Sequence, residues 1–567
     1  MQVFLEPCEP PLFFGERQGI DLSGWTGATR DPAIGRVQRA LNAAIAGQLP
    51  DEAPTFSARK SRHFPSQLFF GLLAALTVTA FGGWWWMNSS ASAGPTRVAV
   101  QPVKALSAEA SLADSLTDQI RTSLNDGHIP TISSTDSEGL SGNDVEPKLK
   151  SLGVGYLLNG TIERSGKTLH VRLHLDDRVR HESLWSYEAS GTADDPAMLN
   201  SKVARAIAGV ISCAYRALGP GGLSETDLLS RYLRACDLFV NHDDATDTKS
   251  TFELFDDLRL IMAKAPNFAP AQSDFAKFGA YLAPLLPPDQ ASAVRAEAAS
   301  AGRRALELDP HSADAYVAQE MLLPPTEWTK REALLRKAVS VDPKWPHSNG
   351  FLAMLLTETG RIREAAVYGQ KAAAADLQID WKPFGARMAC DAGQAEGQIA
   401  ELQSRMSNAP SDADNKWALR WCLLDAGRIG ESAKLDHPAD DPKLDALRKA
   451  AEKALETKNP KDFAKARQIA SSLPTDPSTA RFVIPWSAAV GDVDTAFRFA
   501  GTISPGYPTT GILDFLFTPQ TASMRNDPRF FTLVRRYGLA QFWLATGRWP
   551  DFCAGPRLNA CRSASAA

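Results

Sequence analysis

The sequence predicts a multidomain chain of α+β and all-α parts: a single transmembrane helix, an α+β domain and a helical solenoid. Three observations predict this. A run without charge covers residues 68–87, residues 97–189 are rich in alternating apolar and polar positions, and turn residues further on recur every 33 or 34 positions. A chain of 567 residues is also long enough for several domains.

Composition excludes some classes of protein. The formal net charge is −4, with 61 basic and 65 acidic residues, so no global field attracts nucleic acid. Seven cysteines are too few for a disulfide scaffold, and no pair has the spacing of a zinc site. Two alternatives remain open for Cys213 with Cys236 and for Cys553 with Cys561: disulfides in the periplasm, or free or buried thiols.

The predicted membrane helix covers residues 68–87, LFFGLLAALTVTAFGGWWWM, and twenty helical residues span about 30 Å, the thickness of a bilayer core. A buried core helix would usually carry a polar face, and a cleaved signal peptide would not follow so long a segment. The charge bias predicts a bacterial inner-membrane protein with a cytoplasmic N-terminus and periplasmic C-terminal domains. The residues expected at the two membrane interfaces are Arg59, Lys60 and Arg62 before the helix, and Trp84, Trp85 and Trp86 at its far end.

Residues 1–48 carry LEPCEPPLFF, QGIDLSGWTG and a helix with the sequence DPAIGRVQRAL. We expect two short strands, at residues 3–5 and 19–22, before that helix. The segment resembles the last third of bacterial TIR domains. In that family the glutamate that cleaves nucleotides lies upstream of the matched region, so the resemblance implies a truncated remnant without a catalytic residue. Residues 49–67 are polar and contain proline, which predicts a linker.

Residues 96–218 alternate strand and helix signals. We expect strands at 97–103 and 129–132, helices at 108–126 and 145–152, an antiparallel meander of 154–163, 168–176 and 182–189, and a closing helix from Pro196. The runs RVAVQPV, ADSLTDQIRTSL and LGVGYLLNGTIERSGKTLHVRLHL resemble the TolB-like N-terminal domain of bacterial membrane-tethered regulators. That resemblance implies a non-catalytic domain followed by TPR-like repeats.

His170 and His174 lie four positions apart on a predicted strand, so both side chains face the same side. A metal-binding or proton-sensing role is one interpretation. Two solvated histidines on an exposed face beside Arg172 are the interpretation that we favour.

Residues 224–500 lack the strand patterns of the preceding domain and are richer in alanine. Gly360, Gly393 and Gly427 are spaced 33 and 34 residues apart, and proline follows the helices ALELDP, AVSVDP and MSNAP. This pattern resembles TPR repeats, in which stacked helical pairs offer a groove to a peptide or protein. The candidate groove residues are Trp345, Trp381, Trp417 and Trp421, although core packing is the expected fate of most of them.

Residues 501–553 are apolar and rich in aromatic side chains, which predicts a cap on the last repeat. DPRF and WPDFC resemble the segment that follows TPR arrays in TolB-like regulators. Residues 554–567 are small and polar, so we expect a frayed tail.

No catalytic constellation, phosphate loop or metal motif is recognisable, so we expect no enzyme activity and no cofactor. The sequence therefore predicts a non-enzymatic signalling or scaffold protein that binds a protein or peptide partner through its repeats. The alternative is the regulatory remnant of a TIR-type enzyme that cleaves NAD and whose catalytic half is missing.

Overall fold

The computed structural model describes residues 2–4, 19–21, 97–107, 110–126, 129–138, 145–178, 180–218, 222–240, 248–374, 381–435, 441–505 and 513–566. The chain divides into two compact units, Met1–Ser92 and Ala93–Ala567.

In the first unit, strand β1 (Gln2–Phe4) pairs in parallel with strand β2 (Gly19–Asp21). Both strands lie close to their predicted positions. The predicted helix of the remnant, the linker 49–67 and the membrane helix 68–87 lie outside the described residues, as do Arg59, Lys60, Arg62, Trp84, Trp85 and Trp86. Among the described residues, no helix combines the length and the apolar character needed to cross a bilayer.

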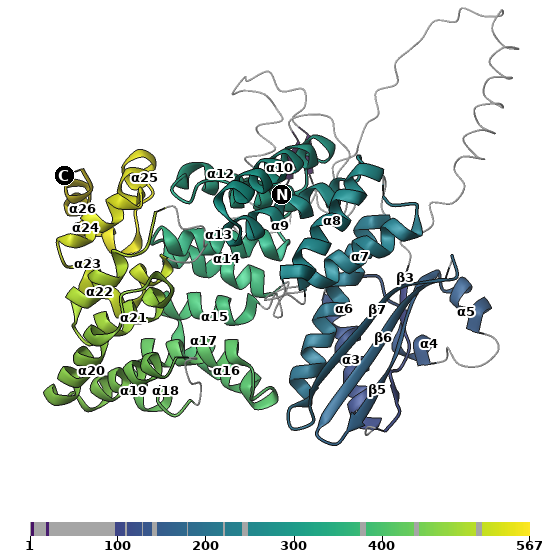
Figure 1. Ribbon diagram of the computed structural model, residues 1–567, viewed down its shortest axis with the longest axis horizontal. Coiled ribbons are helices and arrows are strands. Elements are labelled where there is room, and N and C mark those ends of the chain that lie inside the picture. The colour runs from purple at the N-terminus through teal and green to yellow at the C-terminus, as the bar shows by residue number, and fades with distance from the viewer. Residues whose placement is uncertain are drawn as a thin grey trace, which may run out of the picture. The chain divides into compact units, whose positions relative to one another are not determined.

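The second unit begins with a mixed sheet whose strands have the order β3–β5–β6–β7 (Figure 1). Strand β3 (Arg97–Val100) and the short strand β4 (Lys104–Ala105) both pair in parallel with β5 (Val154–Ser165). Strands β5, β6 (Thr168–Asp177) and β7 (Glu182–Thr192) form the predicted antiparallel meander. The predicted strand at 129–132 is wrong, because this segment makes only one bridge, between Thr131 and Val98.

The apolar face of the sheet is covered by helices α3 (Ala110–Asp126) and α6 (Pro196–Leu218). Helices α4 (Ser134–Glu138) and α5 (Val145–Ser151) lie in the connection between β3 and β5. On β6 the leucines and Val171 are buried, whereas Arg172 and His174 are exposed and His170 is half-buried. The predicted alternation is therefore confirmed.

The rest of the unit is helical, and successive helices pack as antiparallel neighbours (Figure 1). In chain order the helices are α7 (Thr226–Val240), α8 (Thr248–Lys264), α9 (Ala269–Leu282), η2 (Ala283–Leu285), α10 (Pro288–Leu308), α11 (Ala313–Met321), α12 (Trp328–Val341), α13 (Pro346–Glu358), α14 (Ile362–Ala374), α15 (Trp381–Asp391), α16 (Ala395–Asn408), α17 (Ala413–Asp425), α18 (Ile429–Ser432), α19 (Pro442–Thr457), α20 (Pro460–Ser472), α21 (Pro477–Ala489) and α22 (Val493–Ala500). The apolar core of the sheet continues through α6 and α7 into α8 and α9, so it does not end at the predicted boundary near residue 220.

Local sequence explains where these helices start and stop. The side chains of Asp412, Asp441 and Asp476 each accept a hydrogen bond from a backbone N–H of the first helical turn. Such a cap contributes about 1 kcal/mol. Gly360, Gly393 and Gly427 have positive φ angles of 80°, 89° and 72°, a conformation that side chains with a Cβ rarely adopt. The glycines that predicted the repeat period are therefore the residues that reverse the chain.

The C-terminal segment contains η3 (Asp514–Phe517), η4 (Pro519–Thr521), α23 (Ala522–Arg525), α24 (Arg529–Arg536), α25 (Leu539–Thr546), η5 (Asp551–Cys553), η6 (Gly555–Arg557) and α26 (Leu558–Ala566). The prediction of a frayed tail is wrong. A disulfide joins Cys553 to Cys561, Cys561 is buried, and Arg535 donates a hydrogen bond to the carbonyl of Ala564.

The C-terminal segment also packs against helices much earlier in the chain, which the sequence did not predict. Trp328 Nε1 donates to the carbonyl of Tyr537 over 2.7 Å, and Trp543 Nε1 donates to the carbonyl of Thr359 over 3.2 Å. Arg548 forms an ion pair with the buried Glu332 at 2.8 Å. The segment is thus a cap on the last helices and a brace on α12 and α13.

Candidate binding cleft

A cleft of about 610 Å³ opens between the ends of helices α17, α19 and α21 and the start of the cap. This volume lies within the range of about 300–1,000 Å³ that is usual for ligand sites. The lining residues are Leu424, Asp425, Gly427, Ile429, Gly430, Leu455, Glu456, Lys458, Trp486, Ala488, Ala489, Pro519, Gln520 and Ser523. Five of the fourteen lining residues are glycine, alanine or serine, so a ligand backbone can approach closely beside them.

Trp486 is the largest side chain of the cleft, and it lies near the end of α21. Its ring stacks on Trp421 with centroids 5.1 Å apart, and the guanidinium of Arg387 lies 5.2 Å from the centre of the Trp421 ring. Trp486 is only 1% exposed, and its Nε1 has no hydrogen-bond partner among the described residues. A buried N–H without a partner costs about 1–3 kcal/mol of stability. A ligand that brought an acceptor to this N–H would recover that free energy.

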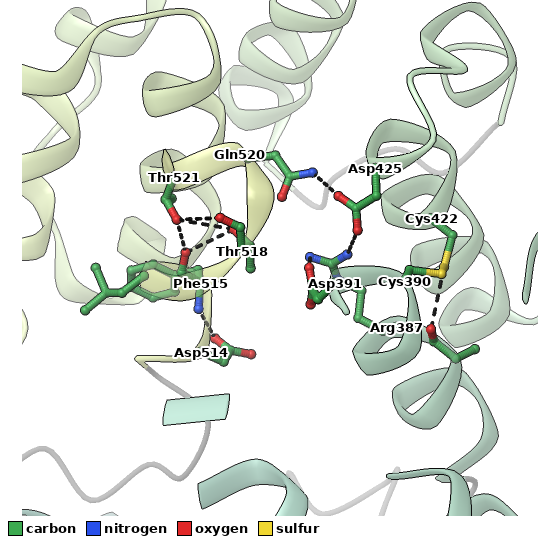
Figure 2. Close-up of polar contacts among 12 residues, drawn as sticks. Arg387, Cys390, Asp391, Cys422, Asp425, Asp514, Phe515, Thr518, Gln520 and Thr521 are labelled. Carbon is green, nitrogen blue, oxygen red and sulfur yellow. Dashed lines mark hydrogen bonds and ion pairs between the residues drawn. A yellow bond between two sulfur atoms is a disulfide. The ribbon is translucent and has the colours of Figure 1, made fainter. Parts of the chain in front are cut away.

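One wall of the cleft is anchored by a group that we call the Arg387 cluster, consisting of Arg387, Asp391, Asp425 and Gln520 (Figure 2). Arg387 lies 2.7 Å from Asp391 and 2.8 Å from Asp425, and all three side chains are almost fully buried. Gln520 donates through Nε2 to the other carboxylate oxygen of Asp425. The cluster therefore joins the repeats to the cap.

The Arg387 cluster holds two carboxyl groups but one guanidinium. Burial raises the pKa of Asp391 well above its ordinary value; Arg387 opposes this, whereas Asp425 and Asp514 reinforce it. Burial therefore favours the protonated form of the Asp391 carboxyl. Burial also lowers the pKa of Arg525, which lies nearby in the cap, to about 10.

The segment that carries Gln520 is held by hydrogen bonds within the cap. Thr518 and Thr521 both donate to the carbonyl of Phe515 (Figure 2). Arg525 donates to the carbonyls of Leu516 and Thr518. On the opposite side, a disulfide between Cys390 and Cys422 joins α15 to α17 close to Asp391 and Asp425.

None of the four tryptophans predicted from the sequence lines this cleft. Trp381 is buried in the core between α13 and α15, and Trp345 and Trp417 are partly buried against neighbouring cores. Trp421 comes nearest, because it stacks on Trp486. Sequence reasoning missed Trp486, Gln520 and the cap side of the site, since these residues fall outside the repeat period.

A second buried polar group lies where the sheet domain meets the helical array, and we call it the Lys277 cluster. Its members are Arg216, Tyr232, Asp274, Lys277, Asp314 and His347. Lys277 Nζ lies 3.0 Å from Asp274 and 2.9 Å from Asp314, and Arg216 lies 3.1 Å from Asp314. Two cations and two carboxyl groups balance one another across α6, α9 and α11.

The opposite charges of the Lys277 cluster shift the pKa values of its members. Burial alone would raise the pKa of Asp314, but Lys277 and Arg216 hold it well below its ordinary value. Burial lowers the pKa of His347, which keeps the imidazole neutral. The adjoining cavity measures about 10 Å³, room for a single water, so a substrate has no access. The cluster fits a structural joint better than a reaction centre.

Disulfides join six of the seven cysteines. The predicted alternatives for Cys213 with Cys236 and for Cys553 with Cys561 are resolved in favour of disulfides, and the pair Cys390–Cys422 was not predicted. In the part of the chain that is described, no three His, Cys, Asp or Glu side chains are placed to hold a metal ion. His174 instead contacts the hydroxyl of Ser186 at 3.0 Å.

Comparison with models of protein families finds no match for this chain, and comparison with curated proteins finds none.

Proposed function

We propose that this protein is a non-enzymatic, membrane-anchored docking protein that binds an extended segment of a partner protein through its helical repeats. The observation that carries the proposal is the cleft at the end of the array, with its small lining residues and its unpaired indole N–H. The Lys277 cluster is closed to substrates, so it gives no support to an enzymatic function.

The finer assignments belong to the same proposal. The meander that follows a strand and a helix supports a TolB-like domain, and helical hairpins that reverse at Gly360, Gly393 and Gly427 support TPR-type repeats. Three disulfides support an oxidising compartment for the second unit, because such bonds persist in the periplasm and are rare in the cytosol. A periplasmic array anchored by residues 68–87 in the inner membrane follows from these points and from the charge bias.

Photo-crosslinking of the full-length chain in living cells tests the docking function. A benzoylphenylalanine at Ala489, which is half-exposed in the cleft, is expected to give one discrete crosslinked protein. The matched control is Ala446, which is exposed on α19 and does not line the cleft. Equal products from both positions, or none from Ala489, would refute the proposal. Reporter fusions after Ser92 and after Ala567 test the topology, and both are expected to report the periplasm.

A further inference from the structure

Two unpaired hydrogen-bonding atoms lie among the residues of the cleft, and they are of opposite kinds. Trp486 offers the donor Nε1, and Gln520 offers the acceptor Oε1. In the part of the chain that the structure describes, neither atom has a partner, and both are shielded from solvent. Among the described residues, the other buried indole N–H groups without partners belong to Trp185, Trp345, Trp381 and Trp549, and none of these lines the cleft.

The orientation of the Gln520 amide is set by its neighbours. Its Nε2 faces the carboxylate of Asp425, which can only accept, and Arg387 holds that carboxylate from the other side. The Oε1 atom is therefore the end of the amide that remains unpaired. An amide turned the other way would place its oxygen against a carboxylate oxygen.

We propose that the cleft clamps the main chain of an extended peptide, with Trp486 Nε1 donating to a backbone carbonyl and Gln520 Oε1 accepting from a backbone N–H. This inference rests on the docking function proposed above and names the part of the partner that is bound. A peptide backbone carries one acceptor and one donor at every residue other than proline, which matches the two unmet atoms.

The rest of the lining favours an uncharged segment. Glu456 and Lys458 carry opposite charges, and Asp425 is already paired with Arg387. Gly427 and Ala488 present almost no side chain to the cleft, so a backbone can come close to the wall. A Cβ added at Gly427 would meet no atom within 4 Å, which confirms that this part of the wall is open.

The test uses the full-length protein in nanodiscs and an array of short capped peptides with random uncharged sequences. Peptides that bind the wild-type protein are expected to bind Trp486→Phe and Gln520→Met about tenfold more weakly, the effect of one lost buried hydrogen bond. Trp486→Phe keeps most of the buried ring. Ala489→Phe fills the cleft from a half-exposed position and is expected to abolish binding, whereas Ala446→Phe should leave binding unchanged.

Methylation of single backbone nitrogens in a bound peptide gives a second readout. One position is expected to lose binding to the wild-type protein, and the same change is expected to have little further effect on Gln520→Met. Peptide binding that survives Trp486→Phe and Ala489→Phe would overturn the clamp and leave the docking function standing. If the wild-type protein binds no peptide but a partner still crosslinks at Ala489, the clamp is also wrong and the docking function stands. If the peptide and crosslinking experiments both fail, the clamp and the docking function are both wrong.

Discussion

The Lys277 cluster and the Arg387 cluster are both buried, both hold salt bridges and both lie beside a disulfide, yet their charges differ. The Lys277 cluster pairs two cations with Asp274 and Asp314. The Arg387 cluster offers one guanidinium to Asp391 and Asp425. The balanced group is closed, while the unbalanced one raises the pKa of Asp391 and adjoins an open cleft. Between these two clusters, unequal charge, and not burial or the presence of salt bridges, accompanies the open cleft.

Removal of one cation from the balanced cluster should have the largest effect. Lys277→Met leaves Asp274 and Asp314 to share Arg216, and an uncompensated buried charge costs about 3–5 kcal/mol of unfolding free energy. Urea unfolding followed by circular dichroism measures the loss. Lys330→Met is the control, because Lys330 is largely exposed and pairs with Glu327 on the surface, where a salt bridge contributes at most about 1 kcal/mol. Similar losses in the two variants would show that the Lys277 cluster is not a joint.

The disulfides beside the two clusters should contribute about equally to the free energy of unfolding. The cysteines of Cys213–Cys236 are 23 residues apart in sequence, and those of Cys390–Cys422 are 32 apart. Replacing both cysteines of either pair by alanine should lower the free energy of unfolding by about 3 kcal/mol. Cys553–Cys561 spans only 8 residues and is expected to contribute less. Thermal unfolding under non-reducing conditions ranks the three variants. A much smaller effect at Cys390–Cys422 would mean that the Arg387 cluster alone holds α15 to α17.

The pH response of the Arg387 cluster should come from Asp391. Its pKa is raised in the folded protein, so the stabilisation is fully present below the unfolded pKa of about 3.9 and is lost as pH rises through the folded pKa. Asp391→Asn mimics the protonated carboxyl and should remove this dependence. Hydrogen exchange of α15 and α17 across a pH series measures it, with the exposed Asp289→Asn as control. An unchanged pH profile in Asp391→Asn would contradict the raised pKa of Asp391.

The Lys277 cluster should show the opposite response, with a smaller amplitude. Burial lowers the pKa of His347, so the stabilisation is fully present above the unfolded pKa of about 6.5 and is lost as pH falls through the folded pKa. His347→Gln should flatten this acid limb in the hydrogen exchange of α13. The exposed His311→Gln should leave the limb intact. If acid loosens α13 equally in both variants, another group is responsible.

Much of the fold could be predicted from local sequence, because local residues determine it. The alternation of apolar and polar residues predicted strand β6, and the spacing of three glycines, which have positive φ angles, predicted the turns of the array. Gly491 reverses the chain in the same way, but it lies 64 positions after Gly427 and so falls off the period. The TIR-like, TolB-like and TPR-like assignments stay predictions.

The candidate site could not be predicted, because it depends on contacts between segments that are distant in sequence. Asp425 comes from a repeat, whereas Gln520 comes from a cap whose sequence gives only aromatic content. Trp486 resembles any other core tryptophan until its missing partner is seen. Charge imbalance in a buried cluster is likewise a property of the folded arrangement, since neither Asp391 nor Arg387 is unusual in its local sequence.

The brace between the C-terminal segment and α12 has a mechanical consequence. Stacked repeats normally touch only their neighbours and can peel away one at a time from a free end. Here Trp328 and Glu332 are fastened to Tyr537 and Arg548, some two hundred positions later in the chain. A force applied at the C-terminus would therefore be transmitted to α12, in the middle of the array. Helices α13 to α22 lie between the two connected segments and would resist extension together.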